Sequence, residues 1–93
     1  MIEKEFTITN KQGMHARPAA LFVKVSNRYE SDIWVEKDDE QVNGKSIMGI
    51  LTLAAAKGDT IVLEIDGTDE ERALEILKKL VLNGFGEDEQ KVV

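Results

Sequence analysis

The chain's only histidine lies beside an arginine and the chain's only proline in the segment GMHARPAA, residues 13–20. Pro18 favours the start of a helix, because the first turn of a helix contains backbone amides without intrahelical partners. His15 is therefore expected just before this helix or at its first residues, where the amides and the helix dipole attract anions such as phosphate. A neutral imidazole is a nucleophile, and Arg17 can bind the oxygens of a transferred phosphoryl group. The segment predicts a histidine that accepts and holds phosphate.

Other interpretations of His15 stay open on spacing alone. The histidine can be an ordinary capping or surface residue, or Arg17 can serve a small acyl-phosphate or phosphate-ester hydrolase. No neighbouring residue is positioned to activate water, which favours a carrier protein over an enzyme. The segment offers no further metal ligands and the chain lacks cysteine, so neither a metal site nor a cofactor is expected.

The charge of the chain is unevenly distributed. The net charge is −6, which argues against nucleic acid as a partner. Residues 10–29 nevertheless carry +4 and contain no acidic residue, whereas residues 1–9 carry −1 and residues 30–93 carry −9. A basic region around His15 in an acidic protein indicates a site for anions or for an acidic protein surface.

A length of 93 residues corresponds to one small domain, which we expect to span residues 1–86, followed by a charged and frayed tail at 87–93. The longest apolar run, residues 50–56, is too short to cross a bilayer, so no membrane insertion is expected. The first residues lack the apolar stretch of a signal peptide, and a cytoplasmic location is expected.

Apolar periodicity predicts four strands and three helices in the order β-α-β-β-α-β-α. This order favours an α+β open-faced β-sandwich, with one antiparallel sheet and helices covering one face. The predicted strands are residues 5–10, 31–37, 40–44 and 59–67, and the predicted helices are residues 18–28, a short one within 46–58, and 68–86.

Two of the helices carry capping signals. Ser46 is a plausible N-cap of the middle helix, and Thr68 with Glu71 forms a capping-box pattern for the last one. The apolar positions expected to face the core are Phe6, Ile8, Ala19, Ala20, Phe22, Val23, Val25, Ile61, Leu63, Ile65, Leu74, Leu77 and Val81.

With these elements in place, GMHARPAA and the segment GKSIMGIL at 44–51 resemble two motifs of the HPr family. This family comprises the histidine-containing phosphocarriers of the bacterial phosphoenolpyruvate-dependent sugar phosphotransferase system. The resemblance covers about residues 2–86 and implies an HPr-like sandwich, with four antiparallel strands and three helices on one face. It also implies that His15 accepts phosphate on Nδ1 from phospho-enzyme I and passes it to a sugar-specific enzyme IIA. Arg17 and the first helix amides, at Ala16 and Arg17, would hold the phosphate.

In this family both partner proteins dock over the first and middle helices. A patch of apolar residues with a basic rim suits brief encounters steered by charge, and such docking suits a monomer. Ile47 and Leu51 can equally be core residues, whereas Met48 is the expected exposed contact. The docking positions that the resemblance implies are Ala16, Ala20, Lys24, Lys45, Ile47, Met48 and Leu51.

Ser46 matches a serine that an ATP-dependent kinase phosphorylates in some branches of the family, so the motif permits a serine kinase and phosphatase as further partners, although the sequence does not show that such a kinase exists. A phosphate there would favour the helix but invert the charge of the rim beside Lys45. Gln12 and the alanines within residues 51–58 depart from the pattern of many sugar-transport members. They leave open a regulatory, nitrogen-related or transport-independent branch that acts through protein binding.

Overall fold

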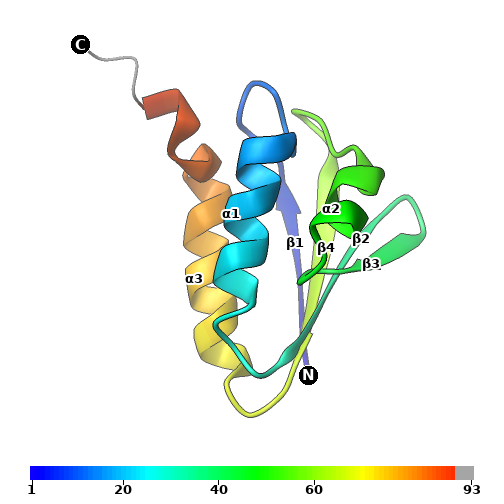
Figure 1. Ribbon diagram of the computed structural model, residues 1–93, viewed down its shortest axis with the longest axis vertical. Coiled ribbons are helices and arrows are strands. Elements are labelled where there is room, and N and C mark those ends of the chain that lie inside the picture. The colour runs from blue at the N-terminus through cyan, green and yellow to red at the C-terminus, as the bar shows by residue number, and fades with distance from the viewer. Residues whose placement is uncertain (90–93) are drawn as a thin grey trace.

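The computed structural model describes residues 1–89, in which three helices cover one face of a four-stranded antiparallel sheet (Figure 1). The order β-α-β-β-α-β-α and the open-faced sandwich are as predicted, and the strands lie in the order β1-β4-β2-β3. The elements are β1 (Ile2–Thr7), α1 (Ala16–Ser26), β2 (Asp32–Lys37), β3 (Glu40–Asn43), α2 (Ile47–Leu53), β4 (Thr60–Asp66), α3 (Glu70–Leu82) and the 3₁₀ segment η1 (Gly84–Glu89).

The inner face of the sheet is built on the alternation of strand β4. Ile61, Leu63 and Ile65 are fully buried and point toward the helices, because successive strand residues face opposite sides of a sheet. The neighbouring strands add side chains to the same face, since Phe6 lies opposite Ile61 and Ile33 lies opposite Ile65. The alternating apolar residues that predicted these strands are therefore the residues that the sheet contributes to the core.

The outer face of the sheet is left uncovered by the helices and is acidic. Glu3 lies opposite Glu64, and Asp32 lies opposite Asp66, so carboxylates face one another across neighbouring strands. Trp34, with 37% of its surface exposed, lies on the same face. Within the described strands, the outward positions hold no lysine or arginine.

The helices close the core from the other side. Ala20 was expected in the core but is exposed, and Val23 and Leu74 are half-buried at the margin. About 100° of helix rotation separates Ala20 from the buried Ala19, which is enough to bring Ala20 to the surface. The buried apolar helix residues are Ala19, Phe22 and Val25 in α1, Ile50 and Leu53 in α2, and Ala73, Leu77 and Val81 in α3.

Helix boundaries depart from the prediction where tertiary contacts intervene. Helix α1 begins before Pro18, because the His15 carbonyl already accepts a bond from the Ala19 amide at 2.9 Å. Helix α2 ends at Leu53, well before Gly58, because Ala54 adopts a left-handed conformation with φ of 50°.

The predicted capping box of α3 is wrong. The N-cap residue is Asp69, and its carboxylate leaves the helix to accept bonds from the backbone amides of Glu30 at 2.9 Å and Ser31 at 3.0 Å. The side chain of Glu70 instead accepts a bond from the Gly67 amide at 3.0 Å. The Asp69 carboxylate therefore makes a tertiary contact in place of a helix cap. The amide of Gly67, just before the helix, is paired with Glu70 instead.

Only part of the predicted tail is described. Residues 87–89 belong to the 3₁₀ segment η1, and residues 90–93 lie outside the described residues. Within residues 1–89, no helix is both long enough and apolar enough to cross a membrane.

Phe22 carries the largest fully buried side chain of the core. Phe22→Ala should lower the free energy of unfolding by about 3–5 kcal/mol, because truncation removes buried apolar surface and leaves a cavity. Leu82, which is 57% exposed on α3, provides the control, and Leu82→Ala should change stability by about 0.5 kcal/mol or less. Urea denaturation followed by circular dichroism measures both, and equal losses would contradict this description of the core.

Candidate functional site

His15 is the N-cap residue of helix α1. Its backbone is extended, with φ of −82° and ψ of −168°, and its carbonyl accepts the first bond of the helix from Ala19. The imidazole is half-buried and makes no capping hydrogen bond to the helix. His15 thus lies at the positive end of the helix dipole, as the sequence predicted.

The first amides of α1 complete an anion-binding arrangement. Among residues 1–89, no backbone carbonyl accepts a bond from the amide of Ala16 or Arg17. Both residues are exposed, and the first turn contains no acidic residue. Unpaired amides, the helix dipole and the guanidinium of Arg17 together favour a phosphate or carboxylate at this end of the helix.

The loop before His15 is held by a set of short contacts. The Asn10 side chain donates to the Gly13 carbonyl at 2.7 Å, and the Met14 amide donates to the Ala55 carbonyl at 2.8 Å. Gly13 has φ of +66°, and a Cβ atom there would lie only 2.4 Å from the Ala55 oxygen. The loop therefore lies directly against the segment that follows α2 and requires glycine at this point.

Ser46 is the N-cap of α2, which confirms the capping prediction. Its Oγ accepts a bond from the Gly49 amide at 3.1 Å, and its carbonyl accepts one from Ile50 at 3.0 Å. The residue is half-buried, and both of these contacts lie within the first turn of α2. Its role as a modification site stays a prediction.

The predicted docking positions lie on two helices that pack side by side (Figure 1). On α1, Ala16, Ala20 and Lys24 are exposed and follow one another at intervals of four residues, so they share one face of the helix. On α2, Met48 is 68% exposed and Ile47 is 39% exposed. The structure thus brings these five residues onto one side of the molecule.

Lys45 and Leu51 are more involved in the fold than the docking prediction implied. The ammonium of Lys45 donates to the Tyr29 carbonyl at 2.7 Å and is partly buried, so it joins the end of α1 to the start of α2. The Asn27 side chain adds a weak contact to the Lys45 carbonyl at 3.5 Å. Leu51 is half-buried and packs against the core.

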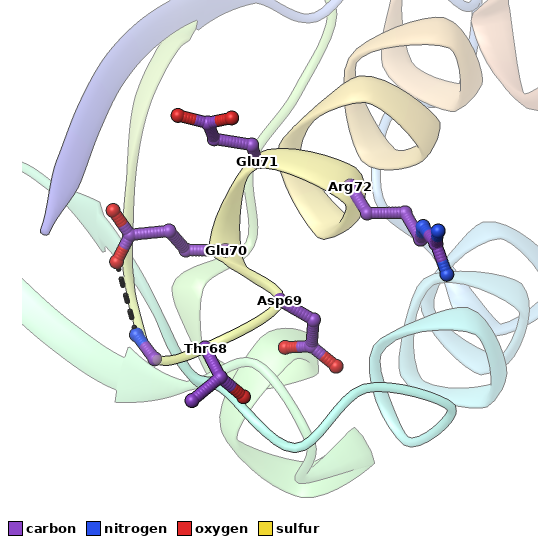
Figure 2. A pocket seen from close by; sticks show the side chains of 6 residues that line it. Thr68, Asp69, Glu70, Glu71 and Arg72 are labelled. Atoms are coloured by element: carbon purple, nitrogen blue, oxygen red, sulfur yellow. Dashed lines mark hydrogen bonds between the residues drawn. The ribbon is translucent and has the colours of Figure 1, made fainter.

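A pocket elsewhere on the surface is lined by residues 67–72 at the start of α3 (Figure 2). Two of its carboxylates are already engaged: Glu70 accepts the Gly67 amide, and Asp69 accepts the amides of Glu30 and Ser31. The hydroxyl of Ser31, followed by the Glu30 amide, holds the pKa of Asp69 below its ordinary value. These contacts join loops of the fold at the end of the molecule opposite the start of α1 (Figure 1).

Sequence reasoning missed three polar residues that support the His15 loop. Asn10 is fully buried, while Lys37 and Asp59 meet at the end of α2, where their charged groups lie 3.5 Å apart. The bond from the Ala56 amide, and then the charge of Lys37, lower the pKa of Asp59. Asn10 stands three residues before Gly13, a spacing typical of a turn, but nothing local in the sequence relates Lys37 to Asp59.

The arrangement at His15 agrees with the comparison of this chain with known protein families. A family model described as the PTS HPr component phosphorylation site matches residues 2–83. The chain belongs to the HPr family of phosphocarrier proteins. Family membership accounts for the open-faced sandwich.

Relatives of two kinds are similar to this chain. The phosphocarrier protein HPr of Neisseria meningitidis is 47% identical over 89 residues, covering 96% of this chain and 100% of its own length. The HPr-like protein Crh of Halalkalibacterium halodurans is 51% identical over 77 residues, covering 83% of this chain and 92% of its own.

Solved structures support the same fold. Two crystal structures of HPr from Thermoanaerobacter tengcongensis, the second of them a dimer, superimpose with TM-scores of 0.90 and 0.75. Each is 49% identical to this chain and covers 92% of it, and the chain spans 97% and 99% of their lengths.

Gly13→Ala tests the close packing of the His15 loop against Ala55. A methyl group there meets the Ala55 carbonyl and also strains a positive φ, so the variant should unfold at a clearly lower temperature than the wild type. Gly58→Ala is the matched control, because Gly58 has φ of +92° but no atom within 4 Å of the added methyl. Thermal unfolding followed by circular dichroism should show the larger loss for Gly13→Ala, and the reverse order would refute the close approach.

Proposed function

We propose that this protein is a phosphocarrier that accepts a phosphoryl group from phospho-enzyme I on His15 and passes it to a sugar-specific enzyme IIA. The observation that carries the proposal is the imidazole at the N-cap of α1, beside the amides of Ala16 and Arg17. Membership of the HPr family supports the choice of donor and acceptor proteins.

The transfer step follows from these groups. An unprotonated ring nitrogen of His15, Nδ1 by family resemblance, attacks the phosphorus atom. The bond between phosphorus and the donor group of enzyme I breaks, and that group keeps the electron pair. The charged phosphoryl oxygens then accept hydrogen bonds from the amides at the start of α1 and from Arg17, which stabilise the phosphohistidine without burying it. In the transfer to enzyme IIA, an acceptor group of that protein attacks the phosphorus atom, and the bond from phosphorus to the His15 nitrogen breaks with its electron pair left on the imidazole.

The exposure of the site supports a carrier role rather than a catalytic one. Ala16 and Arg17 are exposed and His15 is half-buried, so another protein can approach the phosphoryl group directly. The docking positions of α1 follow one exposed face of that helix from its start toward its end, and α2 lies beside it (Figure 1). We expect the protein to act in the cytoplasm as a monomer that binds one partner at a time, which size-exclusion chromatography with light scattering will test.

A second candidate function is regulation through protein binding alone. The likeness to the HPr-like protein Crh supports it. In this alternative the exposed Met48 and Ile47 bind an acceptor protein whether or not His15 carries phosphate.

The phosphocarrier proposal predicts labelling at His15. Incubation with enzyme I, magnesium and phosphoenolpyruvate should add one acid-labile phosphoryl group, which mass spectrometry detects, and His15→Ala should abolish it. Arg17→Ala should slow labelling by about tenfold, since it removes charge-assisted hydrogen bonds to the phosphoryl oxygens. Arg28→Ala, which removes an exposed positive charge beyond the other end of α1, is the matched control.

The other outcomes of this experiment either contradict the phosphocarrier proposal or favour a different function. Equal labelling of His15→Ala ends the phosphocarrier proposal. Steady release of phosphate without a partner protein would favour a hydrolase. Failure of the wild type to label, combined with partner binding that survives His15→Gln, would favour the regulatory alternative.

We also propose that Ser46 is a regulatory phosphorylation site. Ser46→Asp, which keeps an oxygen acceptor for the Gly49 amide but adds negative charge beside the docking residues, should slow labelling of His15 by about tenfold. Ser46→Ala should lower the free energy of unfolding by about 1 kcal/mol through loss of the cap and leave labelling nearly unchanged. Thr68→Asp adds the same charge at the exposed start of α3, so equal slowing by Thr68→Asp would refute a local effect.

A further inference from the structure

The loop that carries His15 is seated on a segment that belongs to neither α1 nor α2. The Met14 amide donates to the Ala55 carbonyl at 2.8 Å, and Gly13 packs so closely that an added Cβ would lie 2.7 Å from the Cα of Ala56. Met14 and Ala55 are both buried. The position of the His15 backbone therefore follows the position of residues 55–56.

Residues 55–56 lack the support of a helix or strand, because α2 has already ended at Leu53. Their support comes from Asp59, whose Oδ2 accepts the Ala56 amide at 2.8 Å while its own amide donates to the Ala56 carbonyl at 2.9 Å. The Asp59 carbonyl also accepts the Ile8 amide at 2.9 Å. The segment before His15 is thus attached to this turn on both sides, through Ile8 and through Met14.

Lys37 reaches the same turn from strand β2. Its ammonium donates to the Leu53 carbonyl at 3.1 Å and lies 3.5 Å from Oδ2 of Asp59. Only 19% of the Lys37 side chain is exposed, so its aliphatic part packs beneath the end of α2. One cation joins the last turn of α2 to the carboxylate that holds residues 55–56.

We propose that Lys37 and Asp59 are positioning residues for phosphoryl transfer at His15. They hold the Ala55 carbonyl in place, and the bond from Met14 to that carbonyl fixes where α1 begins. Neither residue contacts the phosphoryl group. The inference rests on the proposed function of His15. It extends the site from a local motif to a series of contacts that includes Lys37 of β2 and Asp59, the residue before β4.

Asp59→Ala is the decisive variant, and Asp69→Ala is its matched control. Both aspartates accept bonds from backbone amides of a loop, but Asp69 holds the loop at residues 30–31, at the end of the molecule opposite the start of α1 (Figure 1). Both variants should therefore lose stability, but only Asp59→Ala should displace the loop that carries His15.

The first measurement is the rate of phosphoryl transfer from phospho-enzyme I at a temperature where circular dichroism shows all variants folded. Asp59→Ala should slow transfer by about tenfold or more, since small displacements at a reacting group are costly, whereas Asp69→Ala stays within about twofold of the wild type. Asp59→Asn keeps an acceptor for the Ala56 amide and should recover part of the rate, and Lys37→Met should slow transfer in the same sense as Asp59→Ala. Equal rates for Asp59→Ala and Asp69→Ala would falsify the inference.

The second measurement separates this inference from the proposed function. Amide hydrogen exchange followed by NMR should be faster at Met14 in Asp59→Ala than in the wild type, and unchanged at Met14 in Asp69→Ala. If the wild type accepts no phosphate, the proposed function fails, and the exchange at Met14 still decides whether Asp59 holds the loop. Unchanged Met14 exchange in Asp59→Ala refutes this series of contacts whatever the labelling shows.

Discussion

The hydrogen bond from the Met14 amide to the Ala55 carbonyl, at 2.8 Å, is the contact on which the rest of the site depends. It fixes the chain one residue before the imidazole and so determines where α1 can begin. Because α1 begins at Ala16, its first amides face solvent at the place where His15 stands. The buried positions of α1 pack the helix on the sheet, which holds the first amides and the His15 backbone in place.

The two sides of α1 serve different purposes. Phe22 and Val25 are buried against the sheet, whereas Ala20 and Lys24 remain exposed beside the apolar surface of α2. The small side chains of Ala16 and Ala20 on the exposed side leave room for a partner protein to approach the start of the helix. The arrangement combines a rigid scaffold with an open surface, which suits a group that must be received from one protein and given to another.

Much of the fold could be predicted from the sequence, because the decisive signals are periodic. Ile61, Leu63 and Ile65 alternate, and Leu77 and Val81 repeat at the helical interval, so the elements and their order follow from burial alone. The chemical motif is equally local, since His15 and Arg17 are close along the chain and Pro18 marks the start of a helix.

The predictions that failed depend on contacts between distant segments. Asp69 left its helix to bind Ser31, and the capping box predicted at Thr68 did not form. Helix α2 ends where Ala54 turns left-handed and Lys37 binds the last carbonyl, which no capping signal near Gly58 reveals. The support beneath the His15 loop escaped prediction for the same reason, because its members come from separate strands and loops.

The uncovered acidic face of the sheet has a consequence for the protein in a crowded solution. A sheet with one bare face invites a second sheet to stack on it, and the edge strands β1 and β3 invite another strand to add. Glu3 opposite Glu64 and Asp32 opposite Asp66 give up some stability to mutual repulsion. The same carboxylates repel an identical face, which disfavours the stacking of two bare sheets on one another.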